Sequence, residues 1–142
     1  MGLPVVHFEI VGADPAKLRA FYGELFGWDF DLGDASTPAV SRPGEYGFVV
    51  GGANPVPGDG VGESASDGVP GINGGVAGGA GFQPRVLFYI GVPDVEAALR
   101  KAESLGGTRL MGPEPERPAP GALVVGHFAD PEGNVVGLAG TA

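Results

Sequence analysis

The feature that most constrains this chain is an internal repeat, in which residues of the first half recur 80 positions later without a gap. Repeats of this kind indicate two copies of one supersecondary unit. The matched pairs fall where secondary structure needs them. They are Val6 and Val86, Phe8 and Phe88, Ile10 and Ile90, Asp14 and Asp94, Leu25 and Leu105, and Gly27 and Gly107.

Each copy predicts a strand followed by a helix. Apolar residues alternate with others over Val6–Ile10, which is typical of a strand with one buried face, and Val86–Ile90 repeats its core-facing residues. Asp14 is expected to cap a helix beginning at Pro15, because its carboxylate can accept from free backbone N–H groups. Apolar residues at helical spacing then predict a buried stripe, followed by a stop at glycine. The stripe is Leu18, Phe21, Tyr22, Leu25 and Phe26, and the glycine is Gly27.

Three further strands are expected to complete each copy, so that each module has the order βαβββ and the fold class is α+β. In the second copy the helix starts after Asp94 and stops at Gly106 and Gly107. The later strands that the sequence shows most clearly are Trp28–Asp31 and Tyr46–Val50 in the first copy, and Thr108–Met111, Leu123–Ala129 and Val135–Leu138 in the second. We expect residues 1–52 to form the first module, 53–84 a Gly/Pro-rich loop and linker, and 85–142 the second module, within one compact domain.

The segment Gly51–Gly81 is unusual, because 12 of its 31 residues are glycine. With few apolar side chains it cannot offset its ordering entropy by burial, so a long loop is expected. Two interpretations stay open: an inert spacer, or a lid over a pocket.

Charge and composition exclude several functions. The sequence has eight Lys and Arg residues and 17 Asp and Glu residues, for a net charge of −9. This charge disfavours nucleic acid and anionic membranes as partners. The absence of cysteine excludes disulfides and thiolate metal sites. No signal pattern or membrane-length apolar run is apparent, so we expect a soluble, cytoplasmic protein.

The ordered motifs resemble those of the vicinal oxygen chelate superfamily, the glyoxalase, bleomycin-resistance and dioxygenase group. This resemblance implies tandem βαβββ modules whose curled mixed sheets surround a cup, with the helices outside, commonly in a homodimer. The segments that carry it are Val6–Ile10, Asp14-Pro15, Phe21-Tyr22, Leu25–Trp28 and Asp130–Leu138.

Metal-using members of this superfamily hold the ion with four His, Gln or Glu ligands that project into the cup. The resemblance places His7 at the first ligand position, but Leu87 and Gly137 at two others, and no such residue lies within Phe48–Gly52. A divalent metal needs several N or O donors. We therefore expect no metal and no other cofactor, although a divalent ion stays possible.

Candidate binding residues follow from strand alternation, which puts His7 and Glu9 on one face of their strand. With the helix on the other face, both side chains point into the cup, and the same argument places Leu87 and Tyr89 there. His127 is expected to join them from a later strand. Flat apolar walls for a planar ligand would come from aromatic rings. They are Tyr89, Trp28, Phe48 and Tyr46, although Trp28 could instead pack between sheet and helix.

Two functions remain in competition. The favoured one is metal-independent binding of a planar or aromatic small molecule, as in the antibiotic-sequestering resistance proteins of the family, with His7, Glu9 and His127 supplying hydrogen bonds. The alternative is an enzyme of the glyoxalase or dioxygenase kind. It would use His7 or Glu9 as an acid/base, or His7, Glu9 and His127 as a two-histidine, one-carboxylate iron site. A third, an interaction module with a filled cup, is also open.

Overall fold

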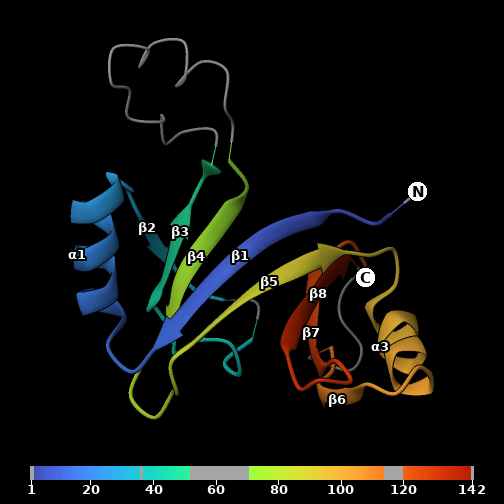
Figure 1. Ribbon diagram of the computed structural model, residues 1–142. Coiled ribbons are helices and arrows are strands. Elements are labelled where there is room, and N and C mark those ends of the chain that lie inside the picture. Colours follow the sequence, from blue (N-terminus) through green and yellow to red (C-terminus); the bar gives the residue numbers. More distant parts are fainter. Residues whose placement is uncertain (1, 36, 52–70, 114–119, 142) are drawn as a thin grey trace, which may run out of the picture. The chain divides into compact units, whose positions relative to one another are not determined.

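The computed structural model describes residues 2–35, 37–51, 71–113 and 120–141 (Figure 1). The chain divides into two compact units, His7–Val86, and Met1–Val6 together with Leu87–Ala142. Along the chain, a strand, a helix and three strands are followed by the same series again. The α+β class and the tandem βαβββ modules expected from the repeat are confirmed.

The unit His7–Val86 carries a sheet in the order β2-β3-β4-β1. Strands β1 and β4 are parallel, whereas β3 is antiparallel to both β2 and β4. Helix α1 packs against β4 and β3. The elements are β1 (Val5–Gly12), α1 (Pro15–Phe26), β2 (Asp31–Gly33), β3 (Tyr46–Val49) and β4 (Asn73–Gly78).

The other unit repeats this order with β6-β7-β8-β5. Strands β5 and β8 are parallel, and β7 is antiparallel to β6 and β8. The N-terminal residues belong to this unit, because the Gly91 N–H donates to the Pro4 carbonyl at 2.9 Å. The elements are β5 (Arg85–Gly91), α3 (Val95–Ser104), β6 (Thr108–Met111), β7 (Leu123–Ala129) and β8 (Val135–Thr141).

Both helices begin and end as their sequences predict. The Asp14 carboxylate accepts from the Lys17 N–H at 3.1 Å, and Asp94 accepts from the Ala97 N–H at 3.0 Å, which satisfies a free donor in each first turn. Gly27 ends α1 with a φ of 71°, a left-handed conformation that costs glycine little. Neither helix is long and apolar enough to cross a membrane, within the ranges that the structure describes.

The helix of the second unit is well buried against its sheet. Leu99 is 0% exposed and Val95 is 2% exposed, and both pack with Val124 of β7 and Leu138 of β8. Gly126 lies directly beneath α3, since a Cβ there would come within 2.9 Å of the Leu99 side chain. The apolar residues Val95 and Leu99 of this helix are thus core, whereas Leu105, at its end, is 70% exposed.

Helix α1 differs, and the prediction that its whole apolar stripe is core is wrong. Phe21 and Leu25 are each 57% exposed, and Phe26 is 46% exposed. The stripe is wider than the part of the helix that faces the sheet, so only its Leu18 and Tyr22 side is covered. Trp28 packs against this covered side, with its ring 5.8 Å from the Tyr22 ring between centroids.

Two strands lie elsewhere than expected. The second strand of the first module is Asp31–Gly33 rather than Trp28–Asp31, and β4 falls inside the segment 53–84, which was expected to be a loop and linker. Glycine has a low strand propensity, which conceals β4 in the sequence. Its glycines are needed because a Cβ at Gly74 would lie 2.0 Å from the Phe8 ring. Of the segment interpreted as spacer or lid, residues 52–70 lie outside the described residues.

Candidate functional site

A hydrogen-bonded chain of three polar side chains lies on the sheet of the unit His7–Val86, on the face opposite to α1. The Tyr46 hydroxyl donates to Glu9 Oε2 at 2.9 Å, and His7 Nε2 lies 2.8 Å from the same hydroxyl. A phenol has only one hydrogen to donate, so His7 is the donor to Tyr46. The two candidates expected from strand alternation, His7 and Glu9, are therefore brought together by a third residue.

A glycine makes this arrangement possible. In the sheet, Glu9 of β1 lies beside Gly75 of β4, which in turn lies beside Phe48 of β3. The Tyr46 ring lies over Gly75, where a Cβ would come within 2.0 Å of the ring. Because Gly75 of β4, between β3 and β1, has no side chain, the Tyr46 hydroxyl can cross β4 and reach Glu9.

The three polar groups differ in their exposure. Glu9 is 1% exposed and Tyr46 is 3% exposed, whereas His7 is only partly buried. Partial burial lowers the pKa of His7, because desolvation disfavours the imidazolium. The imidazole is accordingly held neutral near neutral pH, as a donor at the outer end of the chain.

An aromatic ring stands next to the chain. The rings of Phe48 and Tyr46 have centroids 4.5 Å apart, and Phe48 remains 37% exposed. Phe48 shares a face with Glu9, as its register with Gly75 shows. This face thus presents a flat apolar ring beside an oriented polar cluster, the composition of a small-molecule site.

The second unit has an equivalent pair on the face opposite to α3. The Tyr89 hydroxyl lies 2.7 Å from His127 Nε2, and both residues are 2% exposed. Tyr89 of β5 and His127 of β7 both lie beside Gly137 of β8, where a Cβ would come within 2.4 Å of the Tyr89 ring. A tyrosine again crosses a glycine in the intervening strand.

The remaining two candidates lie apart from these pairs. Leu87, 3% exposed, is two residues before Tyr89 on the same face of β5. Trp28 lies on the helix side of its sheet, 5.3 Å from the Phe8 ring and 5.8 Å from the Tyr22 ring between centroids. Of the two interpretations of Trp28, the structure thus places it between sheet and helix, away from Glu9.

The residues present do not fit the metal site of the superfamily. His7 is engaged with Tyr46, Leu87 offers no donor, and the Tyr89 ring occupies the space that a side chain at position 137 would need. Across the described residues, no group of three or more His, Cys, Asp or Glu side chains is arranged to hold an ion. Positions 87 and 137 therefore lack a donor, and steric contact with the Tyr89 ring prevents one from being restored at position 137.

Comparison with protein families now identifies the fold family, because residues 7–139 match the glyoxalase-like domain. The chain belongs to that family, in the vicinal oxygen chelate superfamily. No curated protein sequence matches the chain significantly.

Solved structures of this superfamily have the same fold at low sequence identity. A glyoxalase/bleomycin resistance protein/dioxygenase superfamily member from Vibrio splendidus is 14% identical, with a TM-score of 0.52 over 98% of this chain and 99% of that one. Methylmalonyl-CoA epimerase from Mycobacterium tuberculosis is 14% identical, with a TM-score of 0.55 over 97% and 87%. A variant of the Streptomyces coelicolor epimerase, in complex with 2-nitronate-propionyl-CoA, is 13% identical, with a TM-score of 0.61 over 99% and 96%.

The hydroxyl of Tyr46 is the part of the site that sequence reasoning missed. Tyr46 was considered only as a possible apolar wall, yet its hydroxyl joins the two polar candidates. The signal lies in Gly75, which sits in a segment that looks like a loop. Had that segment been aligned as the last strand of the first module, a glycine beside Glu9 would have indicated room for a crossing side chain.

Proposed function

We propose that this chain binds a planar small molecule without a metal ion, on the face of the unit His7–Val86 that carries His7, Tyr46 and Phe48. The observation that supports this most is the hydrogen-bonded chain from His7 through Tyr46 to Glu9. It fixes polar groups beside the exposed Phe48 ring before any ligand arrives, which lowers the ordering cost of binding.

The hydrogen bonds from His7 through Tyr46 to Glu9 also favour binding over acid/base chemistry at Glu9. A general base must come within hydrogen-bond reach of the proton that it removes. Glu9 is 1% exposed and its Oε2 accepts from Tyr46, so a substrate meets His7 and Phe48 first. Sequestration of a planar compound, as in resistance proteins of the family, requires only shape and a few polar anchors.

A second candidate function rests on the same three residues. An uninterrupted series of hydrogen bonds can move a proton from an outer imidazole to a buried carboxylate, which suits a metal-free isomerase or lyase. The lowered pKa of His7 keeps its imidazole neutral and able to accept a proton. An enzyme of this kind would lose turnover in Tyr46→Phe while its substrate affinity changed little.

Calorimetric titration of naphthol, and then of larger planar aromatics, tests the proposal. Stacking predicts that Phe48→Ala weakens binding by about tenfold, because the aromatic pair is lost together with apolar contact area. Phe88→Ala is the matched control, since Phe88 is 43% exposed and belongs to the other unit. Equal effects of the two substitutions would contradict binding at this face.

Metal dependence is tested separately by dialysis against Zn, Ni, Mn and Fe(II), followed by measurement of metal per chain. The proposal expects no retained metal and the same naphthol affinity with and without a chelator. About one retained equivalent that is lost in His7→Ala would contradict a metal-free site and favour the enzyme. The homodimer and the cytoplasmic location expected from the sequence stay predictions, and sedimentation would test the first.

A further inference from the structure

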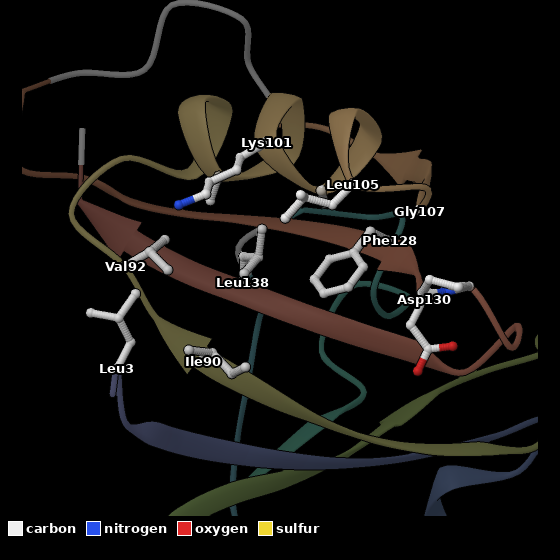
Figure 2. Close-up of a pocket in the computed structure, with 12 residues that line it drawn as sticks. Leu3, Ile90, Val92, Lys101, Leu105, Gly107, Phe128, Asp130 and Leu138 are labelled. Carbon is white, nitrogen blue, oxygen red and sulfur yellow. The ribbon is translucent and has the colours of Figure 1, made fainter. Parts of the chain in front are cut away.

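An apolar pocket lies on the helix side of the unit that contains α3. None of the residues His7, Tyr46, Glu9 and Phe48 lines it. Its volume is about 470 Å³, within the range of about 300–1,000 Å³ that is usual for small-molecule sites. In Figure 2, α3 forms one wall, and Ile90, Phe128 and Leu138 of the sheet face it. Leu3 and Leu105 line it as well, and are 58% and 70% exposed.

The repeat explains the place of the pocket in this unit. Counting 80 residues back, the lining residues Ala98 and Ala102 correspond to Leu18 and Tyr22 of α1. The Tyr22 ring stacks near Trp28, at 5.8 Å between centroids, and occupies the space beneath the C-terminal half of α1. The pocket of that unit lies instead beside the N-terminal half of α1. Replacing two large side chains by alanine on the same backbone leaves unfilled volume beneath the C-terminal half of α3.

One charged group at the pocket is available to a ligand. Lys101 is exposed, and its ammonium has no hydrogen bond or ion pair with any residue that the structure describes. It reaches over the pocket on the side of Val92 and Leu3 (Figure 2). The repeat position that matches Lys101 is Phe21. In the other unit a pocket of about 450 Å³ beside α1 is lined by Phe21 and also by Lys17, so the position of the cation relative to the pocket differs between the two units.

The carboxylate at the opposite end of the pocket is already engaged. Asp130 accepts from the backbone N–H groups of Glu132 and Asn134 and from the Asn134 side-chain amide, each at 2.9 Å. The Asn134 side chain and these backbone donors lower the pKa of Asp130, which keeps it ionised. Its charge therefore stabilises the turn before β8, and repels an anionic head from that end.

We propose that this pocket binds an aliphatic monocarboxylate. Its alkyl chain would lie against Ile90, Phe128 and Leu138, and its carboxylate would lie at Lys101. An apolar lining with a single available cation at one end matches a molecule that is apolar along its length and anionic at one end. This site and the face proposed above belong to different units, so either proposal can fail without the other.

Titration of the full chain with hexanoate, octanoate, decanoate and octanol measures the two parts of this site. Burial of the alkyl chain of the ligand predicts that affinity rises by about fourfold for each added methylene. An exposed ion pair predicts that octanoate binds about two- to fivefold more tightly than octanol at low salt. Affinity independent of chain length, or tighter binding of octylamine than of octanoate, would overturn the proposal.

Substitutions then locate the site. Lys101→Gln is expected to remove the advantage of octanoate over octanol. Lys17→Gln removes the same charge from the pocket beside α1, and is expected to change neither affinity. Ala102→Tyr restores the residue of the first repeat and is expected to abolish binding of both compounds. If that variant does not fold, Ala98→Leu fills the same space more conservatively. Wild-type octanoate binding in a folded, pocket-filled variant would place the site elsewhere and contradict the inference.

Discussion

The two units share one topology, yet their helix–sheet interfaces are built differently. Beneath the C-terminal half of α1 an aromatic cluster fills the interface, with Trp28 5.3 Å from both Phe8 and Phe26 between ring centroids. Beneath α3 the repeat positions of Tyr22 and Trp28 are Ala102 and Thr108, and a pocket remains. Strand order follows from the pattern of the repeat, whereas the place of unfilled volume depends on a few side chains. A pocket therefore lies beneath the C-terminal half of α3 in one unit and beside the N-terminal half of α1 in the other.

On the opposite faces the units differ in chemistry but not in geometry. Tyr46 donates to Glu9 in one unit and Tyr89 bonds His127 in the other, across sequence separations of 37 and 38 residues. In both units the tyrosine lies over a glycine of the last strand. The tyrosine comes from the third strand in one copy and from the first in the other, so the glycine, rather than the residue that crosses it, is the common element.

The largest expected effect comes from filling those glycines. In Gly75→Ala the new Cβ would overlap the Tyr46 ring, which must move and give up its hydrogen bonds. Overpacking of about 1–3 kcal/mol and a lost buried hydrogen bond outweigh the gain of about 0.4–1 kcal/mol from a less flexible unfolded chain. We expect the free energy of unfolding to fall by about 4 kcal/mol, and by about 3 kcal/mol for Gly137→Ala.

Urea denaturation measures both values, with Gly71→Ala as the control. A Cβ at Gly71 would meet its nearest atom at 3.8 Å, an ordinary contact. If Gly75→Ala unfolds at the urea concentration of the control, the crossing of Tyr46 over β4 does not exist in solution, and the geometric parallel between the units is lost.

A somewhat smaller effect tests the difference between the two helices. Leu99→Ala leaves a cavity in a fully buried position and is expected to cost about 3 kcal/mol of unfolding free energy. Leu25→Ala removes the same atoms from a side chain that is 57% exposed, and is expected to cost less than about 1 kcal/mol. Equal losses in urea denaturation would mean that another surface covers α1 in solution, and concentration dependence of the Leu25 loss would identify a second copy of the chain.

The sequence predicts topology better than burial in this protein. The caps at Asp14 and Asp94, the strand Leu123–Ala129 and the repeat itself follow from local pattern, and the structure has all of them. Local pattern also specifies faces, so His7 and Glu9 could be placed together. It does not specify how wide a strip of a helix its sheet covers, which is why Phe21 was expected in the core.

The part of the site that could not be predicted depends on an element that the sequence hides. Strand β4 has glycines where strands usually have branched or aromatic side chains, and its role is to leave room for the rings of Phe8 and Tyr46. Pairing between positions far apart in the chain decides this, and one sequence alone does not show which segments pair. The pocket under α3 was equally hidden, although the repeat, compared residue by residue, indicates it through Ala98 and Ala102.

The smallest expected effect concerns pH and depends on the burial of His7. Burial lowers the pKa of His7 in the folded chain, so as pH falls through about 6.5 the unfolded chain takes up a proton that the folded chain resists. The stability contributed by neutral His7 is therefore complete above that pH and is lost as pH falls toward the folded pKa. Wild type should lose more unfolding free energy between pH 8 and pH 5 than His7→Gln does, with urea midpoints as the measurement. The carboxylates with lowered pKa, Glu96 and Asp130, titrate below pH 5 and do not contribute to this difference. An equal loss of unfolding free energy in wild type and His7→Gln would place His7 in water rather than against Tyr46.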